Sequence, residues 1–158
     1  MSGHGAPTIS LTGAQGLKVT IVAGMWHEEI AEALVAGATR VLDSAHAKTS
    51  IIRVPGSFEL PVVAKAALDN GADAVVALGV IIRGGTPHFE YVSSAATTGL
   101  TDVALHTGKP VGFGVLTLDD EQQGLDRAGL PGSSEDKGAE AAEAALHTAL
   151  LIRSLTQK

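Results

Sequence analysis

The sequence predicts an α/β fold: a single doubly wound parallel sheet with helices on both faces and an edge strand at the N-terminus. Two observations lead to this class. Residues 74–82 are apolar or glycine without alternation, as in a central strand that is covered on both faces. Strand patterns alternate with helical patterns along the chain, and connections of this kind are right-handed crossovers within one parallel sheet. The 158 residues correspond to one domain.

The N-terminal segment is expected to contain no helix. Residues 1–7 are predicted to be disordered, and residues 8–11 to form a short edge strand that no helix follows. Residues 17–23 are the next predicted strand. After a break, apolar residues recur at intervals of three and four from Ile30 to Ala45, which predicts a helix with one buried face.

The next two strand–helix units follow the same order. Residues 50–54 are a predicted strand, and the helix after it has its apolar positions within 60–68 and ends at Asn70-Gly71, where glycine can adopt the left-handed conformation of a helix stop. Strand 74–82 is followed by a glycine turn and then by a helix predicted over 88–105.

The C-terminal third completes the alternation. Residues 111–118 are the last predicted strand, and 119–128 a short helix. A loop rich in Gly, Pro and Ser over 129–134 then leads to a final helix over 135–155. Elements in this order predict a flavodoxin-like three-layer arrangement, in which ligands bind outside the carboxyl ends of the strands.

Composition excludes several classes of protein. The absence of cysteine excludes disulfides and thiolate nucleophiles, and the six histidines show no paired ligand spacing, so no metal is expected. A net charge of −6, with the eleven Lys and Arg scattered, argues against a nucleic-acid surface. No apolar run is long enough to cross a bilayer, and the N-terminus resembles no leader, so we expect a cytoplasmic protein without membrane contact.

Unusual residues follow three of the predicted strands. Trp26, the only tryptophan, lies in a strand-end loop where a ligand ring could stack on it. Glu59 follows a Gly-Ser turn; taken alone, it is best interpreted as a carboxylate at a helix N-terminus. His88 begins a helix after two glycines, where the positive end of the helix dipole favours a neutral base and backbone N–H groups can converge on an anion. A tight turn with a solvated histidine remains the alternative for this segment.

Four motifs resemble those of the lumazine synthase family. The signature spans residues 77–92, with the sequence ALGVIIRGGTPHFEYV, and further motifs occupy 56–61, 125–129 and 136–138. The resemblance covers almost the whole chain. It implies a transferase of riboflavin biosynthesis that condenses 5-amino-6-(D-ribitylamino)uracil with 3,4-dihydroxy-2-butanone 4-phosphate. The product is 6,7-dimethyl-8-ribityllumazine, phosphate and water are released, and no cofactor is implied.

The resemblance also implies a role for each site residue. His88 would be the catalytic residue that moves protons. The pyrimidine ring and ribityl chain would be contacted by Trp26, Ser57, Phe58, Glu59, Val80, Ile81, Ile82 and Phe113. The phosphate would be bound by Gly84, Gly85, Thr86 and Arg127, and Lys137 would support the site. Phe113, Arg127 and Lys137 would come from a neighbouring subunit, which implies a homo-oligomer with shared sites.

Two features depart from the family pattern. Gly85 stands where many relatives carry a polar or acidic residue, which removes a side chain but keeps the backbone donor. The loop between Arg127 and Lys137 is longer than in shell-forming members, which favours a pentamer or a pair of pentamers over an icosahedral shell. Two other functions remain open at this point: a non-catalytic flavin-binding, ribityl-binding or shell protein of the same fold, and a riboflavin synthase of the archaeal type.

Overall fold

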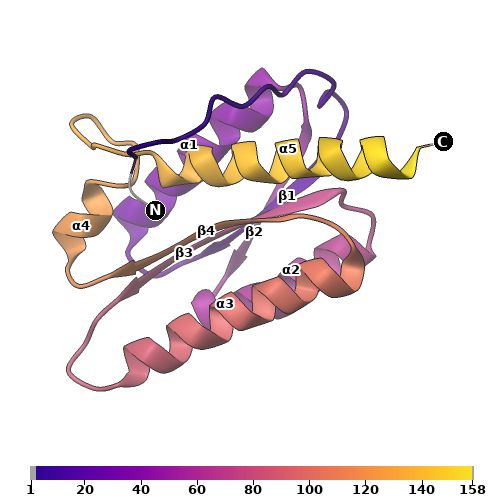
Figure 1. Cartoon of the computed structure of the whole chain (residues 1–158). Coiled ribbons are helices and arrows are strands. Elements are labelled where there is room, and N and C mark those ends of the chain that lie inside the picture. Colours follow the sequence, from indigo (N-terminus) through magenta and orange to yellow (C-terminus); the bar gives the residue numbers. More distant parts are fainter. Residues whose placement is uncertain (1–2, 158) are drawn as a thin grey trace.

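The computed structural model describes residues 3–157 and contains one parallel sheet between two layers of helices (Figure 1). In the order of the sheet, the strands are β2 (Lys48–Val54), β1 (Lys18–Gly24), β3 (Ala74–Ile82) and β4 (Val111–Leu118). One face is covered by α1 (Glu28–Ser44) and α5 (Lys137–Thr156), and the other by α2 (Leu60–Asp69) and α3 (His88–Thr107). Two short helices, η1 (Ser57–Glu59) and α4 (Glu121–Leu125), follow β2 and β4. This architecture confirms the predicted doubly wound α/β class.

The central strand β3 is buried on both faces, as predicted from its continuous apolar sequence. Every second residue packs into the core beneath α1 and α5: Ala74, Val76, Leu78 and Val80. The intervening apolar side chains pack beneath α2 and α3: Val75, Ala77 and Ile81. The alternation explains the absence of polar residues from this strand, because neither face meets water.

Most helices match their predicted positions, and their ends have identifiable causes. Helix α3 begins at the predicted His88 and ends where Gly108 adopts a φ of 66°. Helix α5 begins at Lys137 because the side chain of Asp136 accepts a hydrogen bond from the N–H of Ala139. The predicted helix over 119–128 is shorter in the structure, since Asp120 caps α4 at its start and Ala128 forms an isolated bridge with Asp136.

The predicted edge strand over residues 8–11 does not form within the single chain. The segment lies along the layer of α1 and α5 instead (Figure 1). Leu11 packs against the core on that side, and Nδ1–H of His147 in α5 donates to the carbonyl oxygen of Ser10 at 3.3 Å. Contacts with helices thus replace a strand pairing. Residues 1 and 2 of the segment expected to be disordered lie outside the described residues, and that expectation stays a prediction.

The connections after β1 and β3 lead to opposite faces of the sheet. The chain passes from β1 to α1 on one face, whereas it passes from the adjacent β3 to α3 on the other (Figure 1). A crevice opens outside the carboxyl ends of neighbouring strands whose connections diverge in this way, and ligands of doubly wound proteins bind there. Within residues 3–157, no helix combines the length and the apolar character needed to cross a membrane.

Candidate active site

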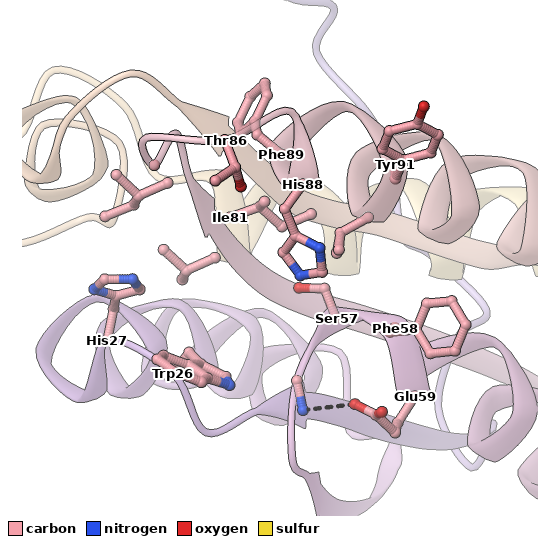
Figure 2. Close-up of a pocket in the computed structure, with 15 residues that line it drawn as sticks. Trp26, His27, Ser57, Phe58, Glu59, Ile81, Thr86, His88, Phe89 and Tyr91 are labelled. Carbon is pink, nitrogen blue, oxygen red and sulfur yellow. Dashed lines mark hydrogen bonds between the residues drawn. The ribbon is translucent and has the colours of Figure 1, made fainter.

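A cavity of about 700 Å³ lies at the carboxyl ends of β1, β2 and β3, at the divergence between β1 and β3. Figure 2 shows how side chains from these strand ends and from the start of α3 surround it. Its walls are formed by Trp26, His27, Gly56, Ser57, Phe58, Glu59, Val80, Ile81, Ile82, Gly84, Thr86, His88, Phe89, Tyr91 and Val92.

Two rings from the loop after β1 form one side of the cavity. Trp26 is 67% exposed, so most of its indole is available to a ligand. The ring of His27 lies 6.4 Å from that of Trp26, centroid to centroid, and is tilted by 44° (Figure 2). His27 has a φ of 56°, a left-handed conformation that costs energy for a residue other than glycine. It sits immediately before α1 and therefore directs the chain from the strand into that helix.

The segment after β2 brings a hydroxyl, a ring and a carboxylate to the cavity, and its Gly56 lies against the indole of Trp26. Ser57 is buried, whereas Phe58 is 65% exposed at the rim. Oε2 of Glu59 accepts a hydrogen bond from the N–H of Gly56 at 2.9 Å (Figure 2). The interpretation of Glu59 as a carboxylate at a helix N-terminus is therefore confirmed, and this role uses one of its two carboxylate oxygens. Within residues 3–157, the structure gives the other oxygen no hydrogen-bond donor.

Strand β3 extends past β1 and presents backbone to the cavity. Its pairing with β1 ends at Leu78, opposite Ala23, while its pairing with β4 continues to Ile82. Beyond Leu78, the edge of β3 that faces β1 pairs with no other strand among residues 3–157. Val80, Ile81 and Ile82 line the cavity along this stretch. An unpaired strand edge offers both N–H and C=O groups. This edge can therefore form hydrogen bonds with a planar ring that carries donors and acceptors.

The turn between β3 and α3 carries the predicted anion-binding residues and His88. The backbone N–H groups of Gly84, Gly85 and Thr86 donate to no acceptor in the part of the chain that the structure describes. Gly84 and Thr86 line the cavity; Gly85 does not. His88 begins α3 and is exposed, and its imidazole lies on the side of the cavity where Ser57 is found (Figure 2).

Arg83, just before this turn, forms two ion pairs. Its Nη1 donates to Oε1 of Glu90 at 2.7 Å, and its Nε donates to Oδ1 of Asp119 at 3.0 Å. Hydrogen bonds from the guanidinium lower the pKa of both carboxyl groups, and the same bonds raise the pKa of Arg83. The three groups therefore remain charged around neutral pH.

Besides Gly85, three more predicted site residues do not line this cavity: Phe113, Arg127 and Lys137. Phe113 lies on the edge strand β4 and is 49% exposed. The Nη1 of Arg127 donates to the carbonyl oxygen of Gln123 at 2.9 Å, and its Nε lies 3.6 Å from Oε2 of Glu135. Nζ of Lys137 lies 3.6 Å from the other oxygen of Glu135. The single chain thus holds one part of the implied site at the cavity and the rest elsewhere.

The structure adds residues that the sequence did not assign to the site: His27, Gly56, Phe89, Tyr91 and Val92. Three of them belong to the same motif as His88, so their position in the motif was an available signal. For His27, the only signal in the sequence was its position next to Trp26. In the described range, 3–157, no group of three or more His, Asp or Glu side chains is arranged to hold a metal ion.

The architecture and the cavity define a class of protein. A doubly wound α/β chain whose cavity, at the divergence of two strands, is lined by a histidine and by a turn with free backbone N–H groups has the architecture of an enzyme that acts on a small molecule. The family model described as 6,7-dimethyl-8-ribityllumazine synthase matches residues 16–153. The chain belongs to the 6,7-dimethyl-8-ribityllumazine synthase family.

Relatives of that name match nearly the full length of the chain. The protein from Clavibacter michiganensis subsp. michiganensis is 74% identical over 98% of this chain and 98% of its own. The protein from Paenarthrobacter aurescens is 62% identical over 99% of this chain and 100% of its own. The protein from Streptomyces coelicolor is 54% identical over 99% of this chain and 98% of its own.

Proposed function

We propose that the cavity is where the two substrates of the family's reaction bind and react. As a member of this family the chain is a transferase of riboflavin biosynthesis: it condenses 5-amino-6-(D-ribitylamino)uracil with 3,4-dihydroxy-2-butanone 4-phosphate to 6,7-dimethyl-8-ribityllumazine. The observation that carries the proposed site is the position of His88 directly after a turn of free N–H groups at the cavity. The cavity thus offers a proton carrier beside an anion-binding turn.

The pyrimidine occupies the side formed by Trp26 and β3. The exposed indole of Trp26 stacks on the planar ring, which buries apolar area at low entropic cost because an indole has few rotatable bonds. The unpaired edge of β3 from Val80 to Ile82 matches the donors and acceptors of a uracil edge. Phe113 of a neighbouring subunit covers the ring from the other side in this proposal.

The ribityl chain lies toward η1. Glu59 has one carboxylate oxygen engaged by Gly56, and the other is open to the hydroxyl donors of a polyol. Ser57 and Phe58 contribute backbone and side-chain contacts along the same path. An apolar cavity with a few fixed polar groups is suited to a ligand that joins a flat ring to a hydroxylated chain.

The phosphate of the second substrate binds at the turn after β3. Gly84, Gly85 and Thr86 supply N–H donors, and the first turn of α3 adds the positive end of its dipole. Arg127 of a neighbouring subunit completes this site with a planar fork that donates two bonds to phosphate oxygens. In the single chain that fork is directed at Gln123 and Glu135, so binding requires it to exchange partners.

His88 moves protons between intermediates, while the nucleophile belongs to the substrate. The 5-amino group of the pyrimidine attacks the ketone carbon, and water leaves as the imine forms. Loss of phosphate breaks a C–O bond and leaves an enol, which tautomerises to a new ketone. The ribitylamino nitrogen attacks that ketone carbon, and loss of its oxygen as a second water closes the ring. Each step transfers a proton, and an imidazole can accept a proton and return it.

The complete site is shared between adjacent chains of a homo-oligomer in the cytoplasm. Phe113, Arg127 and Lys137 are absent from the walls of the cavity in the single chain, which is what a shared site requires. We favour a pentamer or a pair of pentamers, because the loop before α5 forms a folded turn in which the N–H of Leu130 donates to Oγ of Ser133 at 2.9 Å. This added turn would change the angle at which pentamers meet. Multi-angle light scattering tests the assembly, and a mass of an icosahedral shell would contradict it.

One spectrophotometric assay separates this function from the alternatives. The purified protein is incubated with both substrates in one reaction and with the lumazine product alone in another. We expect lumazine to form in the first and nothing to change in the second. Conversion of lumazine alone would indicate a riboflavin synthase, and binding without conversion in both reactions would indicate a flavin-binding or shell protein.

A further inference from the structure

The turn that carries the proposed phosphate site has little packing of its own. A Cβ added to Gly84 or to Gly85 would meet no other atom within 4 Å, so the backbone here runs through open space. In the described part of the chain, the N–H groups of 84–86 form no internal hydrogen bonds either. The position of the turn must therefore be set at its two ends, Arg83 and the start of α3.

Arg83 connects those two ends directly. Its guanidinium bonds to Glu90 in the first turn of α3, across the turn, and to Asp119, just past β4. The same group lies over the ring of Phe89, 4.3 Å from the ring centroid. The backbone N–H of Arg83 donates to the carbonyl oxygen of Leu118 at 2.8 Å, which anchors the residue to β4.

We infer that Arg83 is a positioning residue that holds His88 and the phosphate-binding turn in their reactive arrangement. The inference rests on the roles proposed above for His88 and for residues 84–86. Phe89 and Glu90 are the two residues after His88, so both contacts of the guanidinium act on the helical turn that carries the imidazole. Asp119 follows β4 directly, so its ion pair with Arg83 connects the first turn of α3 to a strand that is fixed in the sheet.

The effect is expected on catalysis and not on folding. Exposed ion pairs each contribute little to stability, and Arg83 is 47% exposed. A displacement of about 1 Å at a reacting group can nevertheless cost roughly 100-fold in rate. The planar guanidinium is suited to this role because it binds two carboxylates and stacks on a ring at the same time, whereas an ammonium can replace only part of these contacts.

The first experiment compares kcat and both KM values for three variants. Arg83→Met keeps an apolar stem without charge, and we expect kcat to fall about tenfold or more while the KM for the butanone phosphate rises more than that for the pyrimidine. In Arg83→Lys, the ammonium can pair with only one of the two carboxylates at a time, so we expect a kcat between those of wild type and Arg83→Met. Arg53→Met is the matched control: it removes an ion pair with Glu32, N to O at 2.6 Å, and should leave kcat unchanged, because neither residue lines the cavity.

The second experiment repeats Arg83→Met in a His88→Ala background, with the uncatalysed rate subtracted. If Arg83 acts through His88, adding Arg83→Met to the His88→Ala enzyme should lower kcat by less than about twofold. The reason is that effects of residues that act as a unit do not multiply. The KM for the butanone phosphate should still rise, since the turn is released in either background. Circular dichroism and light scattering confirm that every variant folds and assembles.

The outcomes separate the inference from the proposal beneath it. A wild-type kcat in Arg83→Met, an Arg83→Lys enzyme as slow as Arg83→Met, or losses that multiply in the double variant would each overturn the role of Arg83. If those results occur while His88→Ala is slow, only the role of Arg83 is lost. If His88→Ala itself retains wild-type kcat, the proposed role of His88 is wrong and the inference falls with it.

Discussion

At the scale of single residues, His88 is the most direct test of the site. It begins α3 beside free backbone donors, it lines the cavity, and an imidazole can both accept and release a proton. We expect His88→Ala to lower kcat roughly 100-fold or more while both KM values change little. The uncatalysed reaction of the two substrates sets a lower limit to the measured rate and therefore an upper limit to the measured loss. Steady-state kinetics over about pH 6–8 provide the measurement, and a wild-type rate across that range would remove His88 from the mechanism.

A second residue, Asp126, links stability to pH. Its Oδ1 accepts a bond from the N–H of Ser134 at 3.0 Å and its Oδ2 one from Oγ of Ser134 at 2.7 Å, and these bonds lower its pKa in the folded protein. A lowered folded pKa stabilises the protein above the unfolded pKa, about 3.9, and this contribution is lost as the pH falls through the folded pKa.

Asp126→Asn should therefore melt below wild type at pH 5–7 by a constant margin, and the margin should shrink below about pH 4. Thermal unfolding followed by circular dichroism at a series of pH values gives the two curves. A margin that stays constant down to the most acidic point would show that the carboxylate's charge contributes nothing to the loop.

At the scale of elements, the packing of η1 against β3 depends on one glycine. A Cβ on Gly79 would collide with Oγ of Ser57 and would lie 3.1 Å from Cδ1 of Leu60, so no larger residue fits without moving η1. We expect Gly79→Ala to destabilise the protein by about 1–3 kcal/mol and to raise the KM for the pyrimidine.

Chemical denaturation and steady-state kinetics would test this prediction. Gly24→Ala, in the neighbouring strand, is the control, since its Cβ would have only ordinary contacts at 3.7 Å or more. Equal effects of the two substitutions would mean that strand glycines, and not the contact with Ser57, account for the change.

The elements that could be predicted are those whose pattern reflects burial. The apolar run of 74–82 and the helical spacing from Ile30 onward both report which faces meet the core, and the structure confirms both. The edge strand over 8–11 could not be judged this way, because a strand needs a partner and the segment finds helices instead. The short α4 depends on capping by Asp120 and on a bridge between distant residues, which periodicity does not reveal.

The residues of the candidate site that could be predicted are those that directly follow the ends of strands. Trp26, Glu59 and His88 follow three strands whose carboxyl ends meet, so their convergence followed from the fold class. The left-handed backbone of His27 and the pairing of Arg83 with Asp119 depend on packing between separate segments, and no local pattern marks them. Motif membership alone also placed Gly85 in the site, whereas its position in the turn leaves it outside the cavity walls.

At the scale of the whole molecule, the proposed shared site predicts that two inactive variants can restore each other. His88→Ala damages the half of each site that the cavity supplies, and Arg127→Ala damages the half that a neighbour supplies. In a ring, every interface joins one surface of a chain to the other surface of the next. If the two variants are unfolded together and refolded as an equal mixture, roughly a quarter of the interfaces should contain both intact halves.

Activity of the co-refolded mixture should then exceed that of either parent and approach that fraction of wild type at saturating substrate. Variants mixed without unfolding serve as the control and should stay inactive if assembled rings do not exchange chains. A co-refolded mixture that assembles normally but shows only the mean activity of its parents would place both halves of the site in one chain.

The exposed Trp26 makes the enzyme its own spectroscopic reporter. It is the only tryptophan in the sequence, it is mostly exposed, and it lines the cavity at the place where the pyrimidine is proposed to stack. Tryptophan dominates protein fluorescence, and an aromatic ring stacked on an indole quenches its emission. The tryptophan emission of this protein therefore comes from a single place in each chain, and each proposed site has one such emitter. A titration that reads only this signal counts occupied pyrimidine sites without any label.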